Sequence, residues 1–308
     1  MSAVPAGCIF DEDWWLDAAA PGGWQRVEVR WDQVLVGSLS FAATRRMGLR
    51  FIGLPPLTRT ASPWLQPPPG APGHALMKKV KILAALMAQL PPHERFDLAL
   101  GTNCPNALPF VMLNYPVGHT YTFVAAASEA SRAAMHQKTR NVVNKAARDF
   151  EVVEGADLSR FFAVLRSQFG AKSRADAADV QRLFDAAHAR GQATVLCAEG
   201  AGGVDSACAV LVWDARSLYF WLSARNPECA STGALSLLIA HAASLAHGRG
   251  LDFDTDGFGT HRSGAFLSKF GFTPAVRPYV SHGTGLWKLS HLVSSALRGE
   301  RDDRHYRY

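Results

Sequence analysis

The chain has 308 residues, 48% of them hydrophobic, which is enough to bury one large core or two modest ones, and two domains are the better expectation. Lys and Arg number 32 against 26 Asp and Glu, giving a formal charge of +6 and a pI near 9.2. This balance favours anionic partners such as nucleic acid, nucleotides or phosphorylated substrates, although many ordinary enzymes are as basic. No uninterrupted run of eighteen apolar residues occurs, which excludes a transmembrane helix.

The N-terminal segment and the cysteines indicate the compartment. Residues 1–23 turn acidic and aromatic where an export signal would need a basic start and a long apolar run, so we expect a cytoplasmic protein. The cysteines are odd in number, and no two form a C-x-x-C pair. We therefore expect reduced, mostly buried thiols, neither a disulfide framework nor a metal site, and no tightly bound cofactor. The five are Cys8, Cys104, Cys197, Cys208 and Cys229.

The first half of the chain predicts a short α/β domain. Its periodicity predicts three strands, a helix, a strand, a second helix and a last strand. Residues 54–74 are too rich in proline for regular structure and are expected to form a long, semi-rigid loop. The predicted elements are strands near 25–30, 33–43 and 48–52, a helix near 76–90, strand 96–101, helix 105–113 and strand 120–124.

The second half repeats this order after three additional helices. Apolar residues recur at helical spacing from Leu235 to Ala246, and the HGRG sequence ends that helix. The predicted elements are helices near 129–149, 157–169 and 179–190, strands at 193–198, 207–213 and 217–223, the helix just described, strand LDFD, a short helix SGAFLSKF and strand AVRPYV.

The two halves also match in spacing. FDLALG at 96–101 and LDFDTD at 251–256 lie 155 residues apart, and TYTFV and VRPYV lie 156 apart. This predicts a divergent tandem duplication. We place the domains at 1–125 and 126–290, expect the active site in the second, and assign 291–308 to a charged tail.

Three meander strands, a long helix, a strand, a short helix and a final strand form the order of the GNAT acyltransferase fold. The chain resembles the Fem-type, double-GNAT transferases through HQKTRNVVNKAARDFEVV (136–153), RNPECASTGALSLLIAHAASLAHGRGLDFDTDG (225–257) and AFLSKFGFTPAVRPYV (265–280). It is also similar to related bacterial GNAT proteins through LPPLTRTASPWL and NALPFVMLNYPVGHTYTFV. The resemblance implies an α/β (α+β) fold with two tandem GNAT-like domains, each a mixed, mainly antiparallel sheet flanked by helices.

The resemblance also implies a reaction class. Members of the family join an acyl or aminoacyl group to an amine, some drawing it from aminoacyl-tRNA and others from acyl-coenzyme A. The family's F-K-x-x-F-G segment reads FLSKFG here, with Phe266 retained, Leu267 at the lysine position and Lys269 two residues on. Two residues turn a helix by roughly 200 degrees, so the two side chains need not point the same way.

The long helix of the second half is where a donor phosphate is expected to bind. Coenzyme A-dependent relatives carry Q/R-x-x-G-x-G/A there, and ECASTGA keeps Gly233 and Ala234 but lacks the leading Arg or Gln, with Arg225 too early. Backbone N–H groups at a helix N-terminus bind phosphate whatever the side chains, so Thr232 and Gly233 remain candidates. We therefore favour aminoacyl-tRNA as donor and keep acyl-coenzyme A as the alternative.

Asp254 and Asp256 are the candidate catalytic carboxylates. On a strand they share one face, and the first-half repeat has Ala99 and Gly101 at these positions. A carboxylate there could orient or deprotonate the acceptor amine. Equally, Asp256 with the glycine after it could be only a turn, and Asp254 a cap or ion-pair member.

Further candidates surround this pair, each with a plainer interpretation. A loop histidine is most often merely exposed, strand aromatics are more often core, and a cation such as Lys269 or backbone N–H groups at a splayed strand could stabilise the oxyanion. With catalytic roles we list His261 and Lys269, and with substrate-binding roles Tyr219, Trp221, Arg225, Arg262, Phe266 and Tyr279.

Lys138, Asn141, Lys145 and Arg148 follow one another at spacings of three, four and three, which forms one basic stripe on a helix. A tRNA backbone could lie along it, although a solvated helix face is the commoner meaning of such a stripe. The acceptor is expected to be a small-molecule or peptide amine.

Two other functions compete. The sequence DGFGTHRSG is a partial nucleotide-binding turn, but it lacks the third glycine and the later acidic residue of a dinucleotide-binding oxidoreductase. A catalytically degenerate double-GNAT module that only binds tRNA or a nucleotide is the stronger rival, because the family's lysine position is changed. The sequence does not name the acyl group, the acceptor or the oligomeric state.

Overall fold

The structure is a computed structural model, and it describes residues 7–46, 48–66, 69, 71–104, 107–128, 134–169, 176–229 and 233–284. The predicted charged tail at 291–308 lies outside these residues. Across the described part of the chain, none of the helices combines the length and the apolar character that crossing a bilayer requires.

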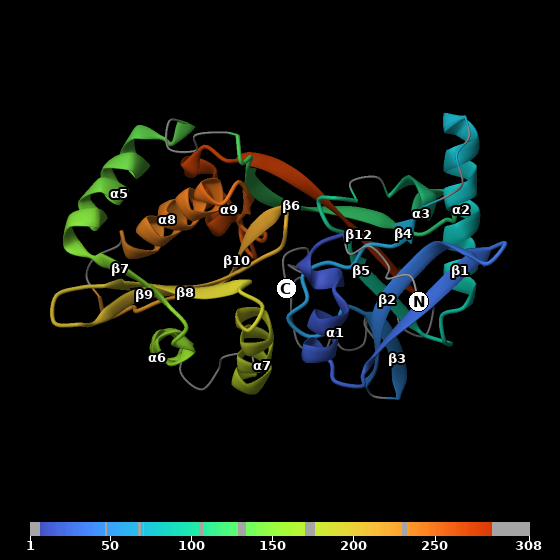
Figure 1. Cartoon of the computed structure of the whole chain (residues 1–308), viewed down its shortest axis with the longest axis horizontal. Coiled ribbons are helices and arrows are strands. Elements are labelled where there is room, and N and C mark those ends of the chain that lie inside the picture. Colours follow the sequence, from blue (N-terminus) through green and yellow to red (C-terminus); the bar gives the residue numbers. More distant parts are fainter. Residues whose placement is uncertain are drawn as a thin grey trace, which may run out of the picture. The chain divides into compact units, whose positions relative to one another are not determined.

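The chain divides into two compact units (Figure 1). The first unit comprises residues 1–120 together with 276–308, and the second unit comprises residues 121–275. The predicted boundaries, 1–125 and 126–290, differ from this division mainly in the last strand. That strand belongs to the first unit because its residues 279–283 pair with a strand of that unit.

The first unit contains a twisted sheet with helices packed on it. Its strands follow the order β1-β2-β3-β5-β12-β6, with β4 beside β2. Phe41, Phe96 and Phe110 are central to its core. The elements are η1 (Ile9–Asp11), α1 (Asp13–Ala19), β1 (Trp24–Trp31), β2 (Val34–Arg46), β3 (Leu49–Gly53), β4 (Trp64–Leu65), α2 (Pro72–Ala88), β5 (Arg95–Ala99), α3 (Leu108–Met112) and the first part of β6 (Val117–Ala125).

The second unit carries the sheet order β6-β11-β10-β9-β8-β7. Helices α5 and α8 lie on one side of these strands, and α6 and α7 lie on the other (Figure 1). The elements are α5 (Gln137–Asp149), β7 (Glu151–Gly155), α6 (Leu158–Phe169), α7 (Ala177–His188), β8 (Ala193–Glu199), β9 (Asp205–Trp213), β10 (Ser217–Arg225), α8 (Ala234–Gly248), β11 (Asp252–Asp254), α9 (His261–Leu267), η3 (Ser268–Phe270) and β12 (Thr273–Gly283), whose residues from Val276 on belong to the first unit.

The core of the second unit forms around α8. The apolar positions that the periodicity assigned to this helix are buried, among them Leu238, Ile239 and Ala242. They pack on alternate residues of β8, β9 and β10, together with Val143 and Ala146 of α5. The helix ends where Gly250 adopts a left-handed φ of 69°, a conformation that favours glycine.

The predicted repeat is visible in the element order. Three antiparallel strands, a helix, a strand, a short helix and a strand occur as β1-β2-β3-α2-β5-α3-β6 and again as β8-β9-β10-α8-β11-α9-β12. In both copies the third strand pairs in parallel with the fourth, β3 with β5 and β10 with β11.

The last strands of the two repeats are exchanged. Strand β12, from the second repeat, pairs antiparallel with β5 of the first, with Tyr279 opposite Ala99. Strand β6, from the first repeat, pairs antiparallel with β11 of the second, with Val124 opposite Asp254. Each unit is therefore completed by a strand from the other repeat.

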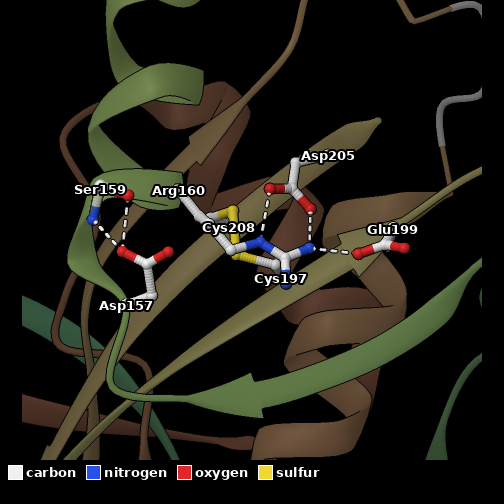
Figure 2. Close-up of a disulfide and its surroundings, with 7 residues drawn as sticks. All are labelled: Asp157, Ser159, Arg160, Cys197, Glu199, Asp205 and Cys208. Atoms are coloured by element: carbon white, nitrogen blue, oxygen red, sulfur yellow. Dashed lines mark hydrogen bonds and ion pairs between the residues drawn. A yellow bond between two sulfur atoms is a disulfide. The ribbon is translucent and has the colours of Figure 1, made fainter. Parts of the chain in front are cut away.

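A disulfide joins the central strands β8 and β9 (Figure 2). Cys197 and Cys208 face each other in the strand register, with Cα atoms 4.2 Å apart. The expectation that all cysteines are reduced is therefore wrong for these two. No local pattern signals the bond, because it depends on the alignment of two strands.

Hydrogen bonds join α6 to the turn end of the β8–β9 hairpin. Arg160 of α6 donates to both carboxylate oxygens of Asp205, at 2.8 and 2.5 Å, and to Glu199 at 2.6 Å (Figure 2). These hydrogen bonds to Asp205 and Glu199 raise the pKa of the Arg160 guanidinium. A bidentate pair of this kind fixes geometry as well as charge, so helix and hairpin are held in one arrangement.

Candidate active site

The centre of the candidate site is the point where β10 and β11 part. The parallel pairing runs from Ser217 opposite Asp252 to Tyr219 opposite Asp254. There β11 ends, whereas β10 continues to Arg225. The pairing of β10 with β9 is also irregular between Tyr219 and Leu222. Backbone N–H groups of a strand that leaves its neighbour can bind an incoming carbonyl, as the predicted oxyanion site requires.

Asp254 lies where β10 and β11 part, and hydrogen bonds from β6 and from the following turn fix its carboxylate. Its side chain is 2% exposed. Oδ1 accepts hydrogen bonds from the Thr122 hydroxyl of β6 and, at 2.8 Å, from the backbone N–H of Asp256. A carboxylate with these donors organises the turn that follows it. The plainer interpretation of Asp254, as a capping residue, describes its contacts.

Thr122 connects this turn to β6. Its Oγ1 also accepts from the backbone N–H of Gly257 at 2.9 Å and lies 3.2 Å from the hydroxyl of Thr255. The Thr255 hydroxyl in turn accepts from the backbone N–H of Phe123 at 3.1 Å. Thr122 was not among the predicted site residues, because a threonine within an apolar strand carries no signal until its partner strand is known.

Asp256 presents the more accessible carboxylate. The residue is partly exposed and adopts a left-handed φ of 60°, followed by Gly257 at 87°. A non-glycine residue in this region is uncommon and persists where its surroundings fix it. Here the hydrogen bonds of Thr122 and Asp254 to the same turn supply that constraint.

An aromatic residue anchors the rest of the loop. The ring of Phe258 lies 5.6 Å from that of Phe123 on β6. It also lies so close to Gly264 of α9 that a Cβ there would approach the ring to 2.8 Å. The loop between β11 and α9 is thus packed at its middle as well as at its start.

The aromatic residues predicted to bind substrate are mainly core. Tyr219 is 7% exposed and donates its hydroxyl hydrogen bond to Asp214 at 3.2 Å, in the turn between β9 and β10. Trp221 is 2% exposed. Tyr219 nevertheless has Asp254 as its strand partner, so its backbone borders the candidate site.

Helix α9 carries three of the predicted residues, two in its exposed first turn and one against the core. His261 and Arg262 are exposed in the first turn, after a capping box formed by Thr260 and Ser263. Phe266 packs on the core and meets Phe270 edge to face.

Leu267 and Lys269 point to different surroundings. Leu267 is buried in the core, whereas Lys269 is exposed. The two side chains therefore lie on different sides of this segment, as their spacing predicts. The backbone carbonyl of Lys269 accepts a hydrogen bond from the N–H of His136 at 3.0 Å, so Lys269 adjoins the N-terminus of α5.

Helix α5 displays the predicted basic stripe. Lys138, Lys145 and Arg148 are exposed, while Val143 and Ala146 are buried on the opposite side. The helix begins at Gln137, after His136 accepts at its N-cap from the N–H of Lys138.

The stripe adjoins the N-terminus of α8. Gly233 precedes α8, and a Cβ on it would lie 2.8 Å from Cβ of Ala146 and 3.4 Å from Val142. Val142 lies one turn from both Lys138 and Lys145 on the helix surface. The start of α8 is therefore beside the edge of the basic stripe that Lys138 and Lys145 form.

The other predicted residues are Arg225, Thr232 and Tyr279. Arg225 is exposed at the end of β10, where its N–H donates to Gln168 at 2.9 Å, and Thr232 lies outside the described residues. Tyr279, predicted to bind substrate, belongs to the first unit and lies beside Asp97, because β12 pairs with β5. Burial and the charge of Asp97 raise the pKa of Tyr279 to about 12.

Among the residues the structure describes, one group could in geometry hold a metal ion. The ligand atoms of Cys197, Asp205 and Cys208 lie within 4.8 Å of one another. The two sulfur atoms are joined in a disulfide, and Asp205 is paired with Arg160. A disulfide is not the thiolate that binds metals, so this group stabilises the hairpin.

Comparison with known proteins agrees with this geometry. Residues 131–259 match the acetyltransferase (GNAT) domain family. FemX is similar in structure, with 12% identity, a TM-score of 0.62, and coverage of 91% of this chain and 93% of FemX. L-PGS from Bacillus licheniformis has 11% identity, a TM-score of 0.56, and coverage of 93% and 92%.

A third solved structure carries two GNAT domains in one chain. It is a tandem GNAT protein from the clavulanic acid biosynthesis pathway, determined without AcCoA, with 12% identity, a TM-score of 0.53, and coverage of 92% of this chain and 90% of that protein. No curated protein matches the sequence. At these identities the likeness concerns the fold.

Proposed function

Because residues 131–259 match the acetyltransferase (GNAT) domain family and the fold is similar to that of FemX, we propose that the chain transfers an aminoacyl group from aminoacyl-tRNA to an amine acceptor. The amine attacks the acyl carbonyl directly while both substrates are bound. The donor ester supplies the activated carbonyl, so the reaction needs no resident cofactor. Alignment of the two substrates accounts for much of the acceleration.

The observation that carries the choice of donor is the packing of Gly233 against α5. It brings the first N–H groups of α8, which favour a phosphate, next to the stripe of Lys138, Lys145 and Arg148. Lys269 adjoins the N-terminal end of α5, the helix that carries this stripe. A row of cations that continues past one phosphate position suits a polynucleotide better than a single small donor.

The chemistry is assigned to the turn after β11. Asp256, partly exposed, orients the acceptor ammonium and accepts its proton, whereas buried Asp254 fixes the turn through Thr122. The backbone of β10 beyond Tyr219 stabilises the oxyanion. His261, Arg262 and Lys269 lie on the exposed side of α9 and η3, where they meet substrate phosphates.

Binding of tRNA tests the choice of donor. Bulk aminoacylated tRNA and the same tRNA deacylated are compared by filter binding, with acetyl-coenzyme A as competitor. We expect preference for the charged form, and loss of about tenfold or more in affinity for Lys138→Glu combined with Lys145→Glu. The matched control is Arg166→Glu with Arg190→Glu. It changes the net charge by the same amount at an exposed residue of α6 and at an exposed residue of the turn after α7. Equal loss in both double variants contradicts a specific tRNA surface.

Transfer from acyl-coenzyme A is the second candidate. It is favoured by Gly233 and Ala234, which the sequence keeps at the start of α8, and by the acetyltransferase family that residues 131–259 match. Competition by acetyl-coenzyme A, with no preference for charged tRNA, would select it. Binding of either donor without turnover toward any amine would instead identify a binding module.

A further inference from the structure

The short helix α3 of the first unit exposes an apolar stripe. Leu108, Val111 and Met112 are 41%, 50% and 42% exposed, at positions i, i+3 and i+4 of one turn. Pro109 and Phe110 face inward and are buried. A helix at a protein surface normally turns polar residues outward, so α3 has a second apolar side that the described residues of the unit leave exposed.

The neighbouring helix adds cations and another apolar side chain. Helix α3 packs against α2 (Figure 1). On α2, Met77 is 46% exposed, and Lys81 lies one turn further along the same side and is also exposed. Lys79, two residues from each of them, is exposed on roughly the opposite side of α2.

Basic residues outnumber acidic ones in the segment that contains α2 and α3. From Gln33 to Ser128 the sequence has eight Lys and Arg residues, and only Glu94 and Asp97 are acidic. Glu94 accepts from the backbone N–H of Arg50 at 2.5 Å, and Asp97 is paired with Arg95. No carboxylate is present in α2 or α3 to oppose an approaching anionic surface.

From this juxtaposition we infer that α3 and the exposed side of α2 dock on an anionic lipid surface. Leu108, Val111, Met112 and Met77 enter the boundary between headgroups and acyl chains, and Lys81 meets the headgroup charges. Nucleic acid would not use the apolar stripe. A two-fold contact with a second copy would set cations against cations, which disfavours self-association. The inference does not depend on the acyl donor.

The test is co-sedimentation of the full chain with vesicles of phosphatidylcholine alone or with about a third phosphatidylglycerol. We expect binding only to the anionic vesicles, and weaker binding as salt is raised. Val111→Glu with Met112→Glu should abolish it, and Lys81→Gln should reduce it about fivefold.

The control is Val34→Glu with Val204→Glu, at two other exposed valines, which are 64% and 51% exposed. All substituted side chains are at the surface, so melting temperatures should stay unchanged, and this is measured first. Equal binding to both vesicle types, or equal loss in the control, would overturn the inference. So would a wild-type dimer that becomes a monomer in the Val111→Glu, Met112→Glu variant, since that result assigns the face to a second copy.

Discussion

The hydroxyl of Thr122 donates a hydrogen bond to the buried carboxylate of Asp254, 132 residues away in the chain. Thr122 belongs to the last strand of the first repeat, and Asp254 ends a strand of the second. The candidate catalytic turn is therefore built from both repeats, which meet through the exchanged strand β6.

Replacing Thr122 with valine should impair both folding and activity. The change keeps the shape but removes the donor to Asp254 and the acceptor of the Gly257 N–H, which should lower the free energy of unfolding by about 1–3 kcal/mol. Turnover should fall with it, because the turn loses its anchor. Urea denaturation and steady-state kinetics measure the two effects.

Thr194→Val is the matched control for this substitution. Thr194 is also buried in the second unit and donates to the Gly155 carbonyl at 3.1 Å, away from the turn. It should lower stability without lowering turnover at a temperature where both variants are folded. Equal turnover in the two variants would show that Thr122 has no specific role in the candidate site.

Separate substitutions of Asp256 and Asp254 should distinguish the catalytic role of the first from the structural role of the second. Asp256→Asn, at a partly exposed residue, should change stability by less than about 0.5 kcal/mol and reduce turnover by roughly 10²- to 10⁴-fold. Asp254→Asn should lower stability by about 1–3 kcal/mol, because it alters a buried acceptor. Full activity in Asp256→Asn would show that this carboxylate is not the base.

Gly233→Ala should disturb the contact between α5 and α8. The added Cβ would lie 2.8 Å from that of Ala146, so one helix must shift, at a cost of about 1–3 kcal/mol. Ala146→Gly in the same chain should restore most of the loss. Gly248→Ala, in the last turn of α8 with open space around it, is the control and should not destabilise. Thermal denaturation and tRNA binding are measured for the wild type and these three variants.

The disulfide between Cys197 and Cys208 should contribute measurably to stability. It closes a loop with a sequence separation of 11, for which about 2–3 kcal/mol is expected. Denaturation with and without reductant should show this difference in the wild type. The Cys197→Ala, Cys208→Ala variant should not respond to reductant, and a wild type that also fails to respond would show that the bond does not contribute.

Asp11 should make the first unit less stable as pH rises. Burial raises the pKa of this carboxyl from 3.8 to about 6, despite hydrogen bonds from Cys8 and Ser62 that lower it. The folded state thus binds the proton more tightly, and its stability falls between about pH 4 and pH 6.

Asp11→Asn should remove that part of the pH dependence and, above pH 6, gain roughly 1–2 kcal/mol relative to the wild type. Urea denaturation at pH 4.5, 5.5, 6.5 and 7.5 measures the difference. Asp17→Asn, at an exposed residue of α1, controls for the loss of one negative charge. Parallel curves for the wild type and Asp11→Asn would contradict the assignment.

The sequence by itself determined the local elements, the duplication and the resemblance to the double-GNAT fold. Helical spacing in α8, the short apolar runs of β8 to β10 and the glycines between them depend on neighbouring residues, so the pattern indicates them directly. The basic stripe of α5 was visible for the same reason, because residues three and four apart share a helix face.

The tertiary structure alone decided which strands pair and what each predicted side chain meets. The repeat does not specify whether β6 and β12 stay with their own copy, since both alternatives satisfy the same alternation of apolar residues. Their exchange places Tyr279 in the first unit and brings Thr122 to Asp254, whose carboxylate accepts its hydrogen bond and holds the turn. The alignment of β8 with β9 likewise made a disulfide from two cysteines that no local spacing had joined.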